Sequence, residues 1–466
     1  MSDIKPIDTD TDTDTVLYTD TDTDTAPGDV PQTPPAPDVE AKLPPGKTAL
    51  VGLQQLLVSN VWLDPLFIAG VGGLSAGLSA NLVAVTFLAA GLATLVQTWR
   101  LVRLPIVEGP SSAFDAMAIA AAKSGQLAAA TTGLVIGAAL VFLAAVTGVL
   151  GSVRRFFTPA VTGTVMLLVG LVLAQFTFLE FFGGEPSAPG FAAPATVLIA
   201  VVTCGAVYAL GRGRTRPYAF LLALALGDGL AGVFGRLDFG VAADAAWFGL
   251  PSFLPYGPLT FDAGLTVTMT VIFLVAVIEA IGCYEATAEH TGRTLTSRRL
   301  GAGVAGEAGG SLVSGLFGGF GTTAYAQNLG VVQMTGVASR RAVRATALIM
   351  ITLAFCPKIG AFLVATPAPV VGGLFLPAAA AVCLAGLRLI GKVLDDQRRL
   401  LFVALALMAG LGLPTLGRPF LDHLPSVLAD LAGQGVVVGT VTVLALEILG
   451  GQRSSGPTTR STSGGR

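Results

Sequence analysis

Carboxyl side chains inside long apolar stretches are the residues of this sequence best suited to chemistry. Glu279 is embedded in VIFLVAVIEAIGCY, and Glu307 lies among glycines in GVAGEAGGS. An ionisable group in hydrocarbon is energetically costly, so it usually faces a cavity or a partner. Such a group can bind a polar solute or take up a proton. Glu279 is the stronger candidate because apolar residues flank it on both sides.

Two more acids, Glu108 and Asp115, flank a break in the apolar segment LPIVEGPSSAFDAMAIAA, residues 104–121. Two prolines and a glycine prevent a regular helical start there, and Ser111 and Ser112 are small and polar. Two roles stay open for Glu108, Asp115 and Glu307. They either take part in the function directly, or they have a structural role in which they cap half-helices and bond backbone amides.

A second polar segment, TTAYAQNLGVVQMTGVASRR, occupies residues 322–341. Its start favours a strand, and a helical pattern follows. Irregular backbone is tolerated in a bilayer only where it is buried in protein or lines a cavity. Tyr325 either borders a bound ligand or is an aromatic core residue, and Asn328 is expected to support the half-helix.

The two broken segments lie half a chain apart, and seven apolar segments separate their positions. Because the repeat has an odd number of segments, the second copy has an inverted orientation in the membrane. Paired broken segments in inverted halves indicate a transporter's binding site near the middle of the membrane. Each half-helix directs its positive N-terminus at that site. The alternative is that both segments are only glycine-rich helix contacts.

The composition requires a membrane environment for these segments. The chain has 466 residues, of which 53% are hydrophobic and only 12% charged. A soluble protein of this length needs more charge to cover its surface, so we predict an all-α polytopic membrane protein. No nucleophile–base set, metal-ligand spacing or cofactor loop is evident, which argues against an enzyme. The net charge of -2 does not indicate a nucleic-acid partner.

Charge placement supports fourteen membrane-spanning segments between residues 47 and 450. Seventeen Lys and Arg residues follow the even-numbered segments, and three follow the odd-numbered ones. The positive-inside rule then places both termini in the cytoplasm. Glu447 lies near the end of the last segment and is expected to reach the interface.

Several motifs carry a resemblance to a known family. AQNLGVVQMTGVASR resembles the signature of the nucleobase–ascorbate transporter family, also called nucleobase–cation symporter-2, and in motif it is closest to bacterial xanthine and urate permeases. IEAIGCYEATA resembles the family's eighth-span motif, and GLQQLLVS resembles its first-span Gln-His motif with Gln55 in place of His. The resemblance extends over about residues 47–450.

The resemblance implies a fold of two inverted seven-span repeats, with short β-strands in spans 3 and 10. It also implies a core domain from spans 1–4 and 8–11, a gate domain from the others, and often a homodimer in the plasma membrane. The implied core segments are 46–156 and 263–366, and the implied gate segments are 157–262 and 367–450. Composition itself predicts a disordered, acidic and Pro-rich tail at 1–45 and a flexible tail at 451–466.

The resemblance further implies a secondary transporter that imports a nucleobase with H⁺, or with Na⁺, and needs no cofactor or metal. It assigns substrate contact to Glu279 and Gln327, and backbone amides at Ser111, Ser112, Ala326 and Gln327 are further candidates. Uracil-selective members tend to carry Glu at the position of Gln327, so an oxopurine of the xanthine or urate type is expected. Uracil and an anion of the related sulfate and bicarbonate transporters are the alternatives.

Proton coupling is expected at Glu279. One helical turn further on, the family often has Asp or His, whereas this chain has Cys283, and a thiol carries protons poorly at neutral pH. Glu307, Glu108 and Asp115 are the candidates to assist Glu279.

Overall fold

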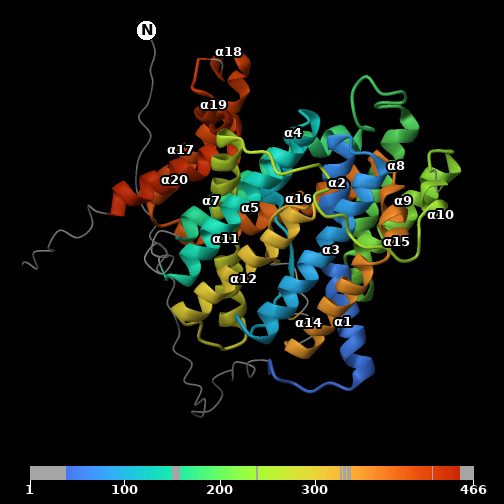
Figure 1. Cartoon of the computed structure of the whole chain (residues 1–466), viewed down its shortest axis with the longest axis horizontal. Helices are drawn as coiled ribbons and strands as arrows, with labels where there is room; N and C mark the ends of the chain where they lie inside the picture. Colours follow the sequence, from blue (N-terminus) through green and yellow to red (C-terminus); the bar gives the residue numbers. More distant parts are fainter. Residues whose placement is uncertain are drawn as a thin grey trace, which may run out of the picture. The chain divides into compact units, whose positions relative to one another are not determined.

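The computed structural model describes residues 38–148, 158–237, 240–325, 328, 332, 337–421 and 423–451. Nearly all regular structure in this part of the chain is helical (Figure 1). Gln327 and Ala326, two of the predicted contact residues, lie outside it.

One group of packed helices comes from two separate stretches of the chain. Helices of the first stretch pack on those of the second, for example α3 on α14 and α12, α5 on α11, and α1 on α14. The group comprises α1 (Pro45–Ser59), α2 (Leu63–Gly72), α3 (Ala76–Trp99), α4 (Asp115–Lys123), α5 (Leu127–Val146), α11 (Ala263–His290), α12 (Ser297–Leu316), α14 (Arg340–Ala354) and α15 (Pro357–Val364).

A second group is built around α7 and α16, which pack along most of their lengths. Gly163 and Gly386 lie at this contact, and a Cβ on Gly386 would be 2.7 Å from the carbonyl oxygen of Gly163. The backbones can approach closely because neither residue has a side chain. The group comprises α7 (Pro159–Phe181), α8 (Pro194–Leu210), α9 (Ala219–Val233), α16 (Ala368–Ile390), α17 (Gln397–Gly412), α19 (Ser426–Gly433) and α20 (Gly435–Gly451). The short α18 (Arg418–Leu421) contacts α19, and the short α10 (Gly240–Asp244) packs on α15 of the first group.

Seven helices in the described residues are long and apolar enough to cross a membrane, and two bent helix pairs raise this number to nine. The chain is therefore a multi-pass membrane protein. The difference from the fourteen predicted segments has a physical reason. α4, α8 and α9 have only 9, 17 and 15 residues, α12 carries arginines and a glutamate, and most of the tenth segment lies outside the described residues. Fourteen spans stay a prediction.

The two polar segments meet in a short antiparallel ladder. β1 (Glu108–Pro110) pairs with β2 (Thr322–Ala324), and Gly109 lies opposite Thr323. All six residues are buried. The ladder joins two stretches of chain that are more than 200 residues apart, as the register implies.

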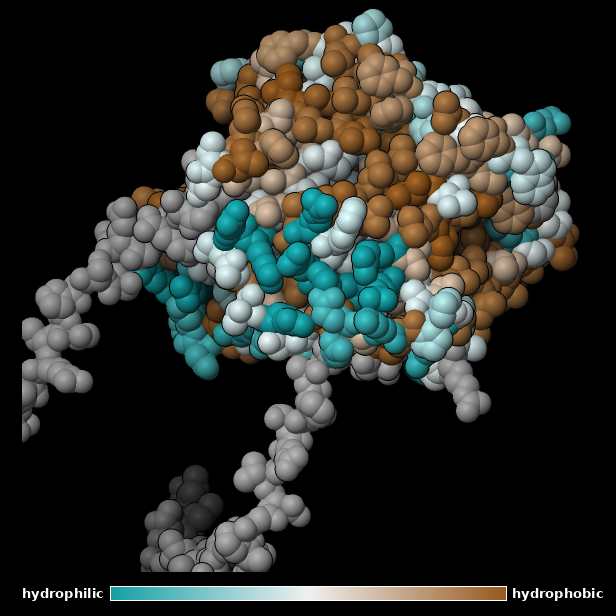
Figure 2. Space-filling view, turned by 60° about the horizontal axis from the view of Figure 1, so that its bottom comes forward, coloured by the Kyte–Doolittle hydropathy of each residue, from teal (hydrophilic) through white to brown (hydrophobic). Residues whose placement is uncertain are grey.

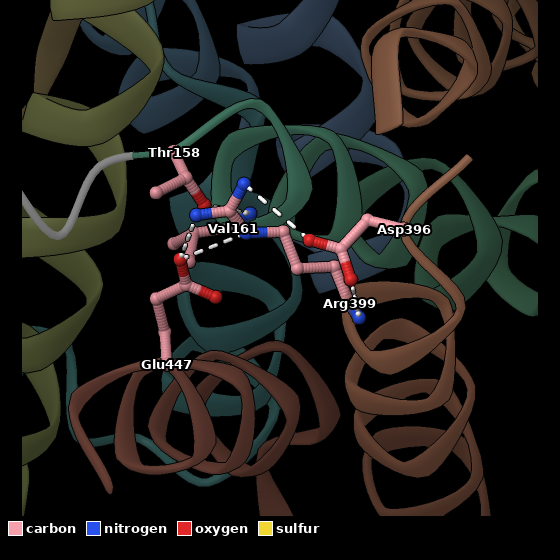
Figure 3. A network of polar contacts seen from close by, with 5 residues as sticks. All are labelled: Thr158, Val161, Asp396, Arg399 and Glu447. Carbon is pink, nitrogen blue, oxygen red and sulfur yellow. Dashed lines mark hydrogen bonds and ion pairs between the residues drawn. The ribbon is translucent and has the colours of Figure 1, made fainter. Parts of the chain in front are cut away.

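Glu447, which is predicted to reach the interface, is held against a neighbouring helix by an ion pair. Figure 3 shows the guanidinium of Arg399 between the carboxylates of Glu447 and Asp396. The distances are 3.0 Å from Nη2 to Glu447 Oε1 and 3.6 Å from Nη1 to Asp396 Oδ2. Glu447 is only 8% exposed. The pair therefore connects α20 to the start of α17.

A strap precedes α1, formed by residues 38–44. Val39 is buried against Val332 and Ala338, and its carbonyl accepts from the Arg340 amide at 3.0 Å. The Glu40 carboxylate lies 2.5 Å from the Arg340 guanidinium. This hydrogen bond to Arg340 lowers the pKa of Glu40 below its ordinary value.

The strap reaches the side of the molecule where arginines collect. Helices α1, α12 and α14 end or begin at the lower edge of Figure 1. Figure 2 turns this side forward and shows hydrophilic surface gathered between apolar surfaces. Exposed arginines on these elements include Arg298, Arg299 and Arg341. An apolar band beside a basic face is the surface expected of a protein embedded in a bilayer.

Candidate functional site

The first apolar segment is broken in the middle, which places an acid at a helix start. α1 ends at Ser59, Asn60 adopts a left-handed backbone with φ of 51°, and α2 begins at Leu63. Asp64 therefore lies in the first turn of α2, where the positive end of the helix favours a carboxylate. Its side chain is buried, with 7% exposed.

Asp64 connects this break to both strands of the ladder. Its Oδ2 accepts a hydrogen bond from Ser112 Oγ at 3.2 Å, just after β1. Oδ2 also lies 3.2 Å from the hydroxyl of Tyr325, just after β2. That hydroxyl lies 2.8 Å from the Pro110 carbonyl oxygen as well. Three interrupted segments thus converge on one carboxylate.

Glu279 approaches the same place from the middle of α11. Its Oε2 accepts from Ser111 Oγ at 3.4 Å. Asp64, Asp115 and Glu279 lie close enough to repel one another electrostatically. Among the described residues, no Lys, Arg or His forms an ion pair with any of the three.

The central cavity lies between these polar groups and the second helix group. The first group contributes mainly polar residues, and the second contributes only apolar ones from α7 and α16. The volume is about 40 Å³, which is room for a few water molecules. The lining residues are Ser59, Asn60, Leu63, Asp64, Pro110, Ser112, Glu279 and Tyr325 on one side, and Leu173, Phe375, Ala378, Ala379 and Val382 on the other.

A separate acid pair lies behind the ladder. The hydroxyl of Tyr284 lies 2.7 Å from Glu307 Oε1 and 3.4 Å from Glu108 Oε1, and Gln97 Nε2 donates to it at 2.8 Å. Both carboxylates are fully buried. Neither of them lines the central cavity.

The structure brings some predicted residues together and separates others. Ser112, Glu279 and Tyr325 line the cavity, and Ser111 bonds Glu279. Asp115 begins α4 and is buried beside these groups, 1% exposed. Cys283 is also buried, but it does not line the cavity.

Asn328 contacts α1 rather than the cavity. Its Nδ2 donates to the carbonyl oxygen of Gln55 at 2.9 Å and to Gln55 Oε1 at 2.8 Å. Gln55, the residue in place of the motif histidine, is 1% exposed. This pair ties the tenth segment to the first.

Asp64 is the residue that sequence reasoning missed. The signal was the Asp-Pro dipeptide formed with Pro65, inside the apolar run VWLDPLFIAG. Proline lacks an amide hydrogen, so it suits the first turn of a helix and indicates a helix start within the run. An acid just before it is then an acid at a half-helix N-terminus.

Comparison with known proteins identifies the family. Residues 46–418 match Xan_ur_permease, described as a permease family. The chain belongs to the nucleobase–ascorbate transporter family. It is a permease and not an enzyme, and its family is the one that its motifs resemble.

Curated relatives of this family cover nearly all of the chain. The uric acid permease PucK of Bacillus subtilis (strain 168) is 32% identical over 413 residues, which are 85% of this chain and 94% of the relative. The xanthine permease of the same strain is 29% identical over 87% of this chain and 94% of its own length. Xanthine permease XanP of Escherichia coli (strain K12) is 29% identical over 88% and 93%.

Solved structures of transporters share the fold of this family member. The transmembrane domain of the cyanobacterial bicarbonate transporter BicA matches with a TM-score of 0.59 at 15% identity, over 88% of this chain and 99% of that chain. SLC26A9 matches with a TM-score of 0.61 at 12% identity, over 88% of this chain and 66% of that chain. The fold is therefore the inverted-repeat fold of these transporters.

Proposed function

We propose that this permease imports a purine nucleobase of the xanthine or urate type by proton-coupled symport. One observation carries the proposal: the central cavity has a polar wall from one helix group and an apolar wall from the other. A solute that hydrogen-bonds to the first group alone can move with it past the second. The names of the relatives support a purine as that solute.

The chemistry of the polar wall fits a flat heterocycle. An ionised Asp64 accepts hydrogen bonds from ring N–H groups, and Glu279 keeps an acceptor oxygen for such a group even when it carries a proton. The hydroxyls of Ser112 and Tyr325 donate to Asp64 here, and they can turn to ring carbonyl oxygens when a ring N–H takes their place on that carboxylate. Gln327, which both donates and accepts, is proposed to complete one edge of the ring. A wall of this kind rejects rings that lack the matching edge, because its own polar groups are left unpaired.

Proton coupling follows from the crowding of acids. Asp64, Asp115 and Glu279 repel one another, and several neighbouring negative charges cannot all persist in a low-dielectric site. A proton that binds with the solute relieves this repulsion. We assign this proton to Glu279, which faces the cavity.

Alternating access is supported by the size of the cavity. A volume of about 40 Å³ is too small for a bicyclic ring, so loading requires α16 and α7 to separate from the polar wall. We propose that the group containing α1–α5 and α11–α15 is the mobile core and the other group the gate. The arginine-rich side is proposed to face the cytoplasm of the plasma membrane, with both termini there, and the transporter is proposed to be a homodimer.

Uptake measurements test the function. Cells that express the chain should accumulate radiolabelled xanthine or urate more than uracil, and a protonophore should abolish the accumulation. Glu279→Gln should abolish transport, whereas Glu289→Gln, at an exposed position of the same helix, should not. Gln327→Glu should shift preference towards uracil. Normal transport by both Glu279→Gln and Gln327→Glu would refute the proposed site.

A further inference from the structure

A second cavity lies next to the central one and is larger. It is formed where α2, the start of α3, the end of α7 and the junction of α15 and α16 meet, and its volume is about 260 Å³. Its wall includes Leu66, Gly70, Ser79, Glu180 and Thr366. Like the central cavity, it lies between the two helix groups.

An aromatic pair lies between the residues of the two cavities along both α2 and α16. Phe67 of α2 stacks on Phe375 of α16 with ring centroids 3.8 Å apart and an interplanar angle of 9°. Both rings are buried, 0% and 2% exposed. Along α16, Ala368 lines the second cavity and Ala378 lines the central one, so the Phe375 ring lies between them in sequence. On α2, Asp64 lines the central cavity and precedes Phe67, whereas Gly70 lines the second cavity and follows Phe67.

Glu180 provides the unsatisfied polar group of the second cavity. It is 3% exposed, and its Oε2 has no hydrogen-bond partner among the described residues. Gly70 leaves room for it, because a Cβ there would lie 3.1 Å from Oε2. The hydroxyls of Ser79 and Thr366 already donate to Ser75 O and to Asp228 Oδ2. A buried carboxylate without a partner is costly unless something donates to it.

We propose that the second cavity is a vestibule site in which a donor-bearing heterocycle binds Glu180 before the Phe67–Phe375 pair opens. This inference rests on the proposed function, since the ligand is the transported ring. The carboxylate accepts the same ring N–H groups as Glu279 in the central cavity. A permeating ring thus meets two acceptor sites in series, with stacked aromatic side chains as the barrier between them.

The vestibule also has a defined side. It lies at the end of α7 and the start of α16, whereas the arginines collect at the starts of α12 and α14. Under the predicted topology the vestibule opens away from the cytoplasm, so external reagents should reach it first.

Cysteine labelling on one helix tests the proposal. Ala368→Cys and Ala378→Cys place thiols on α16 on either side of Phe375, and the wild-type chain measures labelling of the four native cysteines. A membrane-impermeant maleimide applied to intact cells should label Ala368→Cys rapidly and Ala378→Cys slowly. Phe375→Ala or the milder Phe67→Leu should speed labelling of Ala378→Cys several-fold and leave Ala368→Cys unchanged.

Substrate protection tests the role of Glu180. Xanthine should slow labelling of Ala368→Cys, and this protection should persist with Glu279→Gln but disappear with Glu180→Gln. Glu185→Gln, at a nearby exposed acid paired with Lys123, is the matched control and should keep the protection. If xanthine protects Ala368→Cys equally with Glu180 and with Glu180→Gln, the vestibule site is refuted. The same holds if xanthine gives no protection although xanthine uptake is normal. Either result leaves the proposed function intact. Absence of xanthine, urate and uracil uptake would instead refute the proposed function.

Discussion

Gly109→Ala is expected to impair transport strongly by displacing one ring. The Tyr325 ring lies against Gly109, and a Cβ at this position would be 2.5 Å from Cζ of the ring. Carbon atoms in contact are normally about 3.5 Å apart or more, so the ring must retreat by about 1 Å. The Tyr325 hydroxyl now lies 2.8 Å from Pro110 O and 3.2 Å from Asp64 Oδ2. A shift of that size breaks both interactions.

The expected magnitude is that of one hydrogen bond, because the hydroxyl has a single proton to share between these two acceptors. A hydrogen bond to a charged carboxylate contributes about 2 kcal/mol, so its loss corresponds to about 30-fold in affinity. The assay is the concentration dependence of xanthine uptake, normalised to protein in the membrane. Gly309→Ala, where a Cβ meets nothing within 4 Å, is the matched control.

Tyr325→Phe separates the two ways in which the ring could matter. It removes the hydroxyl and leaves the ring in place, so it should reproduce most of the Gly109→Ala defect if hydrogen bonding is the cause. Wild-type uptake by Gly109→Ala at normal abundance would refute the reasoning, because it would show that transport does not depend on the position of the Tyr325 ring.

Three further predictions concern stability and the strap. Gly386→Ala should lower the stability of the purified protein by about 1–3 kcal/mol, because the added methyl group overpacks the contact between α7 and α16. Thermal unfolding measures the loss, and Gly391→Ala, where a Cβ meets nothing within 4 Å, is the control that should keep wild-type stability. Equal melting temperatures of the two variants would contradict this prediction. A double-mutant cycle of Arg399→Ala and Glu447→Gln should give a coupling of about 1 kcal/mol, since Arg399 is partly exposed; additive effects would mean that the pair contributes nothing. The hydrogen bond to Arg340 lowers the pKa of Glu40, so the strap contact is present above the ordinary pKa and is lost as pH falls through the lowered one. The ratio of maleimide labelling of Val39→Cys in the parent to that with Glu40→Gln, which cancels the loss of thiolate at low pH, should therefore rise towards one on acidification. A ratio of one at every pH would argue against the contact.

The family and the two broken segments that meet in the ladder could be predicted from the sequence because both depend on local pattern. Prolines, glycines and small polar residues at 104–121 and 322–341 indicate broken segments whatever surrounds them. Glu279 stands out because an acid between apolar residues is rare in a membrane helix. These signals need no knowledge of which helices become neighbours.

What could not be predicted depends on contacts between distant residues. Asp64 joins the candidate site through contacts from Ser112 and from Tyr325, which is 261 positions away. Glu108 and Asp115 look alike in sequence, yet the first faces Tyr284 behind the ladder and the second lies beside the cavity acids. The ion pair of Glu447 likewise depends on how α17 and α20 cross, which no local pattern encodes.

The six-residue ladder has a consequence for how this chain can change. Because side chains alternate between the two faces of a strand, inserting or deleting one residue in residues 108–110 or 322–324 would turn the following side chains to the opposite face. An indel in the first strand would move the Ser111 side chain away from Glu279, and one in the second would move the Tyr325 side chain away from Asp64. New selectivity in this scaffold therefore has to arise by exchanging side chains at constant strand length, and a library of length variants here should contain no active transporter.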